Sequence, residues 1–127
     1  MNYNQLLRSE LSISELGFGC WGLGSDSYGN IEESKSIDLL NFALDLGFNF
    51  FDTSSLYGNR ISEKRIGKFI KSNKQKNIIL STKAGLLPHK PFQMKRNFKK
   101  NHIEQSLEKS LRLLNKNVDI FFLHSPR

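Results

Sequence analysis

Three short apolar runs, each ending on a polar side chain, constrain the fold of this chain more than any other feature. Each run precedes a residue suited to chemistry: Asn49–Phe51 precedes Asp52, Asn77–Thr82 precedes Lys83, and Val118–Leu123 precedes His124. Apolar runs of this length predict buried strands. In a parallel sheet the carboxyl ends of the strands share one rim, where α/β sheets and barrels place their ligands. We therefore expect a carboxylate, an ammonium and an imidazole at one rim.

Amphipathic segments separate these runs. Apolar residues at helical spacing mark three buried stripes: Ile37, Leu40 and Leu44; Ile66, Phe69 and Ile70; and Ile103, Leu107, Leu111 and Leu114. Three residues are placed as helix N-caps, namely Asn30, Ser62 (with Ile61 and Ile66 as a hydrophobic staple) and Asn101, and Gly47 is placed as a helix stop. The alternation of strands and helices predicts an α/β fold with a parallel sheet.

The first 15 residues predict a small hairpin, because segments 3–7 and 11–14 flank a polar turn. A glycine-rich strand, Leu16–Trp21, then opens the main unit over residues 16–127. Its glycines have the spacing Gly17-x-Gly19-x-x-Gly22 of a dinucleotide-binding loop, but no helix opens on the third glycine. We interpret them as sites of tight packing and of a flexible βα loop, and a doubly wound sheet remains an alternative. The longest stretch expected to be irregular is Ala84–Lys99.

Length and composition set limits on the class of protein. The 127 residues suffice for a single domain, and the net charge of +7 favours an anionic partner such as a dinucleotide, a nucleic acid or an anionic membrane. Cys20 is the only cysteine and residues 1–10 do not resemble a signal peptide, so we expect a cytoplasmic protein. No run approaches the roughly 18 apolar residues of a membrane span. His89 and His102 are isolated from other ligand types, so we expect no metal site.

A tyrosine in the loop after Asp52 completes a set of four residues that suits carbonyl reduction. Tyr57 can act as a general acid, Lys83 can stabilise its phenolate, and Asp52 can hold Lys83 in place. His124 supplies a second donor to a carbonyl oxygen on which negative charge develops. None of the four supplies a hydride, so a nicotinamide cofactor is implied. Taken singly, each residue has an ordinary interpretation: a capping carboxylate, a solvated lysine, a structural histidine or a loop aromatic.

In these motifs the chain resembles the aldo-keto reductases. Their second barrel strand ends in an Asp followed by Tyr-Gly, here Asp52 and Tyr57-Gly58; their third ends in a Lys, here Lys83; and their fourth ends in a His, here His124. Also similar are the segments Glu15–Trp21 and Ser106–Leu111. The resemblance implies catalytic roles for Tyr57, Lys83, Asp52 and His124, and nicotinamide contacts for Cys20, Trp21 and Asp52. It also implies a small-molecule aldehyde or ketone as substrate and NADPH, or else NADH, as cofactor.

Members of that family are (β/α)8 barrels of about 250 residues or more, whereas this chain ends just after its fourth strand. The expected fold is therefore a parallel (β/α) half barrel, the first four strands of a TIM-type barrel, preceded by the hairpin. In the family the residues that hold the nicotinamide amide and the cofactor phosphates lie in the second half. We expect a truncated product with little activity, a half barrel completed by a complementary chain or by self-association, or a fragment of a longer protein. The exposed strand edges would be Leu16–Trp21 and Val118–His124.

A basic segment offers an alternative of another class. Residues Lys90–Lys100 interleave positive charge with Phe92 and Phe98, as single-strand nucleic-acid binders do. No recognised nucleic-acid motif accompanies the segment, so we expect a substrate loop, a cofactor loop or a solvated surface.

Overall fold

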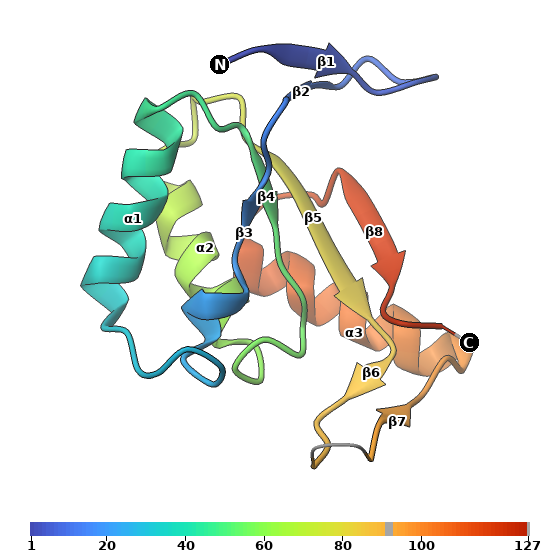
Figure 1. Cartoon of the computed structure of the whole chain (residues 1–127). Coiled ribbons are helices and arrows are strands. Elements are labelled where there is room, and N and C mark those ends of the chain that lie inside the picture. Colours follow the sequence, from blue (N-terminus) through green and yellow to red (C-terminus); the bar gives the residue numbers. More distant parts are fainter. Residues whose placement is uncertain (91–92, 127) are drawn as a thin grey trace.

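The structure is a computed structural model that describes residues 1–90 and 93–126 (Figure 1). Pro91 and Phe92 of the basic segment and the terminal Arg127 lie outside the described residues. The elements, in chain order, are β1 (Tyr3–Gln5), β2 (Ser12–Ser14), β3 (Phe18–Gly19), the 3-10 helix η1 (Trp21–Gly24), α1 (Glu33–Asp45), β4 (Phe50–Asp52), α2 (Ile61–Ser72), β5 (Ile79–Ala84), β6 (Leu86–Leu87), β7 (Lys95–Arg96), α3 (Lys100–Leu114) and β8 (Ile120–Leu123).

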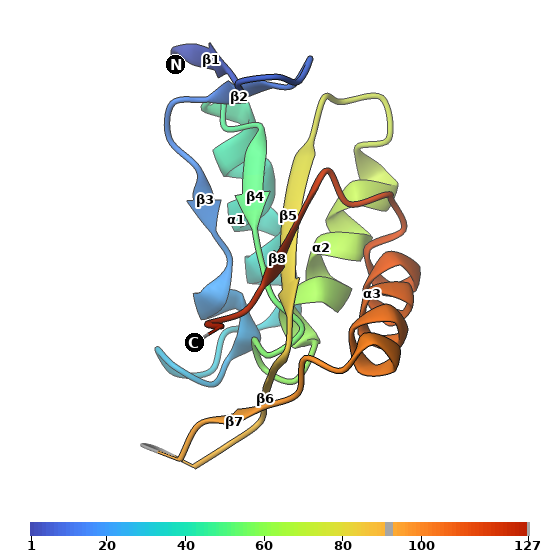
Figure 2. The same ribbon diagram turned by 90° about the vertical axis from the view of Figure 1, so that its right-hand side faces the viewer.

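The central sheet has the strand order β3-β4-β5-β8, and every neighbouring pair is parallel. The three α-helices lie along one side of this sheet (Figures 1 and 2). Strand order that follows chain order, with helices on one side, is the arrangement of a barrel wall, whereas a doubly wound sheet has helices on both faces. The prediction of a parallel half barrel is confirmed, and the doubly wound alternative is wrong.

The hydrophobic core lies between the sheet and the helices. Its fully buried large side chains include Leu40 of α1, Phe51 of β4, Ile66 and Phe69 of α2, and Leu80 of β5. Each such residue stabilises the fold by about 1.5–3 kcal/mol relative to exposure. The predicted stripe of α2 is confirmed, while Ile37 and Leu44 of α1 and most of the predicted stripe of α3 are only partly buried. We attribute the weaker burial on α1 and α3 to their outer positions, since α2 packs between them.

The three predicted N-caps are wrong, although the helices exist. α1 begins after Glu32 and not after Asn30, and Asn101 lies inside α3. Ser62 lies in the first turn of α2, which begins after Arg60, a residue in the left-handed region with φ 76°. The staple is also wrong, because Ile61 is 37% exposed and belongs to the helix. The stop of α1 is confirmed: Gly47 has φ 95°, a conformation that glycine adopts most readily.

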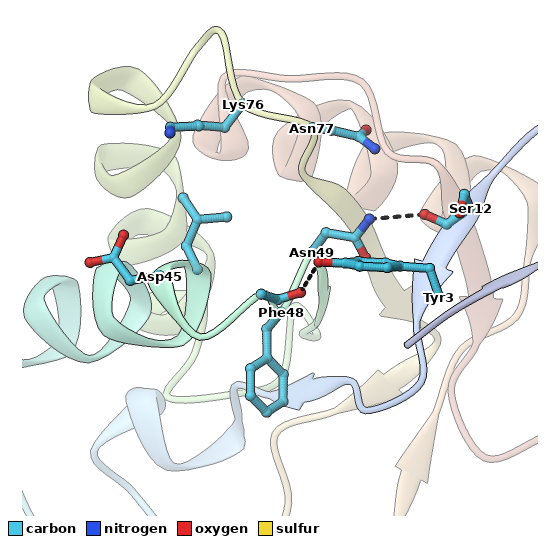
Figure 3. A pocket seen from close by; sticks show the side chains of 9 residues that line it. Tyr3, Ser12, Asp45, Phe48, Asn49, Lys76 and Asn77 are labelled. Carbon is cyan, nitrogen blue, oxygen red and sulfur yellow. Dashed lines mark hydrogen bonds between the residues drawn. The ribbon is translucent and has the colours of Figure 1, made fainter. Parts of the chain in front are cut away.

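The predicted hairpin is confirmed and lies at the amino ends of the strands. β1 and β2 pair antiparallel, and Tyr3 donates a hydrogen bond of 2.9 Å to the carbonyl of Gly47. Asn49 donates a 2.9 Å hydrogen bond to the carbonyl of Ser12, so the residue before β4 holds the hairpin (Figure 3). A hollow of about 380 Å³ lies between the hairpin and the turns that precede β4 and β5. It opens at the end of the sheet opposite Asp52 and Lys83.

Two segments differ from the expectation. The strand expected over Leu16–Trp21 is only Phe18–Gly19, because the chain turns into η1 at Trp21. The stretch Ala84–Lys99, expected to be irregular, begins as the last residue of β5 and then forms the two-stranded ribbon β6–β7. No helix in residues 1–90 and 93–126 is long and apolar enough to span a bilayer.

Candidate active site

The four residues predicted to form a site meet at the carboxyl ends of the parallel strands. Asp52 ends β4, Lys83 lies in β5, His124 follows β8, and Tyr57 lies in the loop after β4. The ammonium Nζ of Lys83 lies 2.6 Å from a carboxylate oxygen of Asp52 and 3.3 Å from the hydroxyl of Tyr57. Its third hydrogen bond, of 2.9 Å, is to the carbonyl of Thr53. All three donors of the lysine are therefore engaged.

Strand register explains why the carboxylate of Asp52 and the ammonium of Lys83 meet. Asp52 of β4 pairs with Ser81 of β5, and Lys83 lies two residues further along the same strand. Because side chains two residues apart point to the same face of a strand, Asp52, Ser81 and Lys83 project together. The hydroxyl of Ser81 donates to the second oxygen of Asp52, so both carboxylate oxygens have partners. Ser81 is a site residue that sequence reasoning missed, and only the alternation with Lys83 could have indicated it.

The loop that carries Tyr57 is anchored on both sides. Along β5, the backbone amides of Thr53 and Ser55 donate to the carbonyls of Ser81 and Lys83 at 2.9 and 3.2 Å. On the other side, the amide of Gly58 donates to a carboxylate oxygen of Asp26 at 2.8 Å.

The same loop approaches the segment after β3 at a pair of glycines. A Cβ on Gly24 would lie 2.6 Å from the amide nitrogen of Gly58, and one on Gly58 would overlap the carbonyl of Gly24. Gly58 also has φ 59°. The two backbones therefore touch directly, and neither position has room for a side chain.

His124 lies beside the phenol. Its ring stands edge-on to that of Tyr57, with centroids 6.0 Å apart and an interplanar angle of 89°. Its Nδ1 lies 2.9 Å from the hydroxyl of Ser54, a fully buried residue. Partial burial lowers the pKa of His124 below its usual 6.5, and the positive charge of Lys83 lowers it further, while Asp52 opposes the shift. The imidazole is therefore neutral at pH 7. Sequence reasoning did not single out Ser54, which lies in the small polar run after Asp52.

The residues expected to contact a nicotinamide differ in accessibility. Trp21 is 48% exposed, and its ring lies 6.4 Å from that of Tyr57 and 5.2 Å from that of Tyr28. Cys20 is fully buried in the core, and burial followed by the charge of Asp52 raises the pKa of its thiol. Its side chain has no surface open to a ligand, so the predicted contact of this residue is not supported by its position.

A buried polar cluster holds the start of α2 against α3 and β5. Arg60 donates to Glu63 at 2.9 Å and to the hydroxyls of Ser106 and Ser110 at 2.8 and 3.1 Å. Glu63 is fully buried and accepts a second hydrogen bond, of 2.8 Å, from the hydroxyl of Thr82. The cluster was not predicted. The sequence holds one signal for it, since Glu63 lies three residues before Ile66 and so shares the buried face of the helix.

A second arginine, Arg65 of α2, fixes η1 and the segment after it. Arg65 is 8% exposed and donates to the carbonyls of Leu23 and Ile31 at 2.7 and 2.8 Å. It thereby holds the segment that follows Trp21. Each of the two segments bordering the site is thus held by an arginine, the Tyr57 loop by Arg60 and the segment after Trp21 by Arg65.

Comparison with known proteins agrees with this geometry. A parallel (β/α) wall with polar side chains gathered at its carboxyl rim is the arrangement of one half of a (β/α)8 barrel. The profile described as "Aldo/keto reductase family" matches residues 15–127. The chain belongs to the aldo/keto reductase family.

Its relatives are considerably longer than the chain itself. The chain is 33% identical to aldo-keto reductase YhdN of Bacillus subtilis over 99% of its own length and 38% of that protein. It is also 33% identical to aldo-keto reductase yakc [NADP(+)] of Schizosaccharomyces pombe, over 89% of this chain and 34% of that one. Aldo-keto reductase AKR11C1 of Bacillus halodurans, solved in its holo form, superposes with a TM-score of 0.82 at 34% identity, over 98% of this chain and 40% of that one. The chain thus spans about two fifths of the length of these relatives.

Proposed function

We propose that this chain carries the proton-transfer half of an NAD(P)H-dependent carbonyl reductase, acting on a small aldehyde or ketone. One observation carries the proposal: the ammonium of Lys83 contacts both the carboxylate of Asp52 and the hydroxyl of Tyr57, at 2.6 and 3.3 Å. This is the arrangement that a tyrosine general acid needs, because a phenolate left after proton donation is stabilised by an adjacent fixed cation.

In this proposal each of the four residues has one role, which the geometry supports. Tyr57 donates its proton to the carbonyl oxygen as negative charge develops there. Lys83 stabilises the phenolate that remains, and Asp52 holds the ammonium in position. His124, neutral at pH 7, offers a ring N–H to the same oxygen from beside the phenol. General acid catalysis of this kind contributes about 10²–10⁴-fold to a rate.

The rim has features that suit a nicotinamide ring. Trp21 presents an exposed aromatic surface beside Tyr57. Gly19 ends β3 in register with Asp52, and nothing lies within 4 Å of the place where its Cβ would be. Trp21, Asp52 and the backbone of Gly19 would hold the ring, and a reduced nicotinamide supplies the hydride that the protein lacks. We propose NADPH as the preferred form, as the name of the yakc relative suggests for that protein.

The fluorescence of Trp21, the only tryptophan, provides a direct binding assay. NADPH and NADH are titrated into the purified chain while the emission of Trp21 is followed, and N-acetyltryptophanamide controls for absorption by the cofactor. Saturable quenching, tighter for NADPH, supports the proposal. A response no different from that of the free indole contradicts it for the chain alone.

A matched pair of variants tests the acid. Tyr57→Phe removes only the hydroxyl, so it should leave the Trp21 titration unchanged and abolish any reduction of a carbonyl test substrate. Tyr28→Phe removes a hydroxyl from a 76% exposed ring at the same rim and should leave turnover unchanged. Equal turnover by the Tyr57→Phe variant and the unaltered chain would eliminate Tyr57 as the acid.

A second candidate function is assembly with another chain through β8. Phe122 and Leu123 of this strand are 45% and 50% exposed, and within the described part of the chain β8 pairs only with β5. Apolar side chains on an edge strand favour pairing with a further strand. Light scattering should detect oligomers that Phe122→Lys dissolves and that Phe42→Lys, on the exposed side of α1, leaves intact. A monomer at all concentrations would contradict self-association.

The cytoplasmic location, and the expectation that the chain binds neither nucleic acid nor membrane, remain predictions from the sequence.

A further inference from the structure

Ser54 contacts a ring nitrogen of His124 and has no role in the chemistry described above. It is fully buried, in the loop between β4 and α2, and its hydroxyl lies 2.9 Å from Nδ1 of the ring. We propose that Ser54 is a positioning residue that donates its proton to Nδ1 and thereby fixes His124 as the tautomer with its proton on Nε2. This deepens the proposed function and rests on it, because only that tautomer offers Nε2–H to a carbonyl oxygen.

The partners of the Ser54 hydroxyl support this direction of donation. A hydroxyl has one proton to donate and two lone pairs that accept. One lone pair accepts from the amide of Leu56 at 3.1 Å. For the proton, two acceptors are within reach: Nδ1 of His124 at 2.9 Å and the carbonyl of Lys83 at 3.5 Å. The shorter contact has ordinary hydrogen-bond length, whereas the longer one lies at the limit. Donation to the ring therefore satisfies the hydroxyl best.

The carbonyl of Lys83 does not need the proton of Ser54. It already accepts from the amide of Ser55 at 3.2 Å and from the hydroxyl of Ser55 at 3.1 Å. With both lone pairs of that oxygen occupied, the ring nitrogen is the acceptor that remains for Ser54. The neighbouring serine thus leaves Ser54 available for His124.

The charged groups around the ring are consistent with a neutral imidazole that has one acceptor nitrogen. Among the described residues, the titratable groups that act on the ring or contact it are Lys83 of β5, Asp52 of β4 and the phenol of Tyr57. A neutral imidazole carries one proton on its two nitrogens, so a donor at Nδ1 places that proton on Nε2.

A second histidine in the same chain serves as an internal reference. Nδ1 of His89 lies 2.8 Å from the carbonyl of Leu87, an oxygen that can only accept. In its neutral form His89 therefore carries its proton on Nδ1, the opposite tautomer to that proposed for His124. The two rings should give contrasting signals in one spectrum.

The test is long-range ¹H–¹⁵N correlation spectroscopy of the chain labelled with ¹⁵N-histidine, recorded above the titration range of the rings. We expect His124 as the Nε2–H tautomer and His89 as the Nδ1–H tautomer. In Ser54→Ala the ratio of Nε2–H to Nδ1–H at His124 should fall about five-fold, the equivalent of one ordinary hydrogen bond. Ser54→Thr keeps a hydroxyl on the same carbon and should restore the ratio. Ser72→Ala, which changes an exposed serine at the end of α2, is the control and should leave the ratio unchanged.

Two results would overturn the inference. One is an Nδ1–H tautomer at His124 in the unaltered chain, a measurement that no folding defect of a variant affects. The other is a Ser54→Ala variant that folds and keeps the original ratio. Neither measurement uses cofactor or substrate, so failure here is distinct from failure of the reductase proposal, which the Trp21 titration decides.

Discussion

Removing one partner of the ion pair between Arg60 and Glu63 should cost more stability than removing one partner of any other ion pair in the described structure. Glu63 is fully buried and the side chain of Arg60 is 12% exposed, whereas each remaining pair has at least one partner more than a fifth exposed. Removing one member of a buried pair costs about 3–5 kcal/mol, because the other charge stays behind without compensation. For Arg60→Met we expect about 3 kcal/mol, near the lower end, since Glu63 keeps its hydrogen bond from Thr82.

Equilibrium unfolding in urea measures this cost. With a slope of about 2 kcal/mol per molar, a loss of 3 kcal/mol moves the midpoint down by about 1.5 M. The double variant Arg60→Met/Glu63→Gln removes the stranded charge and should be about 1–2 kcal/mol more stable than Arg60→Met alone. Arg112→Met, an exposed arginine on α3, is the control and should change stability by less than about 0.5 kcal/mol.

The reasoning is refuted if Arg60→Met costs less than about 1 kcal/mol, or if the double variant is no more stable than the single one. The outcome also bears on the site. Arg60 follows the Tyr57 loop directly and connects it to α3 through Ser106 and Ser110. In the Arg60→Met chain, the amides of Tyr57 and Gly58 should therefore lose protection from hydrogen exchange before other amides do.

Three further predictions concern single residues. Lys83→Met should raise the pKa of His124 and Asp52→Asn should lower it further, since the two charges act on the ring in opposite directions; an NMR titration of the Hε1 signal checks both signs. The pKa of His124 in the folded chain lies below 6.5, so as pH falls the unfolded chain takes up a proton first. The contribution of this residue to the free energy of unfolding is therefore complete above pH 6.5 and is lost as pH falls toward the folded pKa. His124→Asn should flatten the fall in the urea midpoint over that interval. Gly67→Ala should lower the free energy of unfolding by about 1–3 kcal/mol or more, because its Cβ would overlap the backbone carbonyl of Leu113. In Gly19→Ala the added Cβ meets nothing within 4 Å, so thermal unfolding should show a loss of less than about 1 kcal/mol.

The sequence predicts the elements of this fold better than it predicts how they begin. Alternating strands and helices follow from apolar periodicity, which burial enforces along whole segments. Caps depend on the backbone angles of single residues: α2 begins after Arg60 at φ 76°, a conformation that no pattern around Ser62 indicates. Similarly, the β6–β7 ribbon consists of two-residue strands, too short for an alternation to be detected.

The same contrast holds for the site. Asp52, Lys83 and His124 were predictable because each ends an apolar run, and parallel pairing brings such ends together. Ser54 was not predicted, because it lies in a polar run that gives no sign of which hydroxyl will face an imidazole. Ser81 was not predicted either, and only its alternation with Lys83 along β5 could have placed it beside the carboxylate. Cys20 shows the limit of a family pattern, since it lies next to Trp21 in sequence yet has a fully buried side chain.

The contact between Gly24 and Gly58 limits how the selectivity of this rim can be re-engineered. Side chains introduced at either glycine would push the two loops apart and move Trp21 away from Tyr57 before they reached any ligand. Saturation libraries aimed at new carbonyl compounds should therefore keep both glycines, keep Trp21 because it is proposed to hold the nicotinamide, and vary the 76% exposed ring of Tyr28.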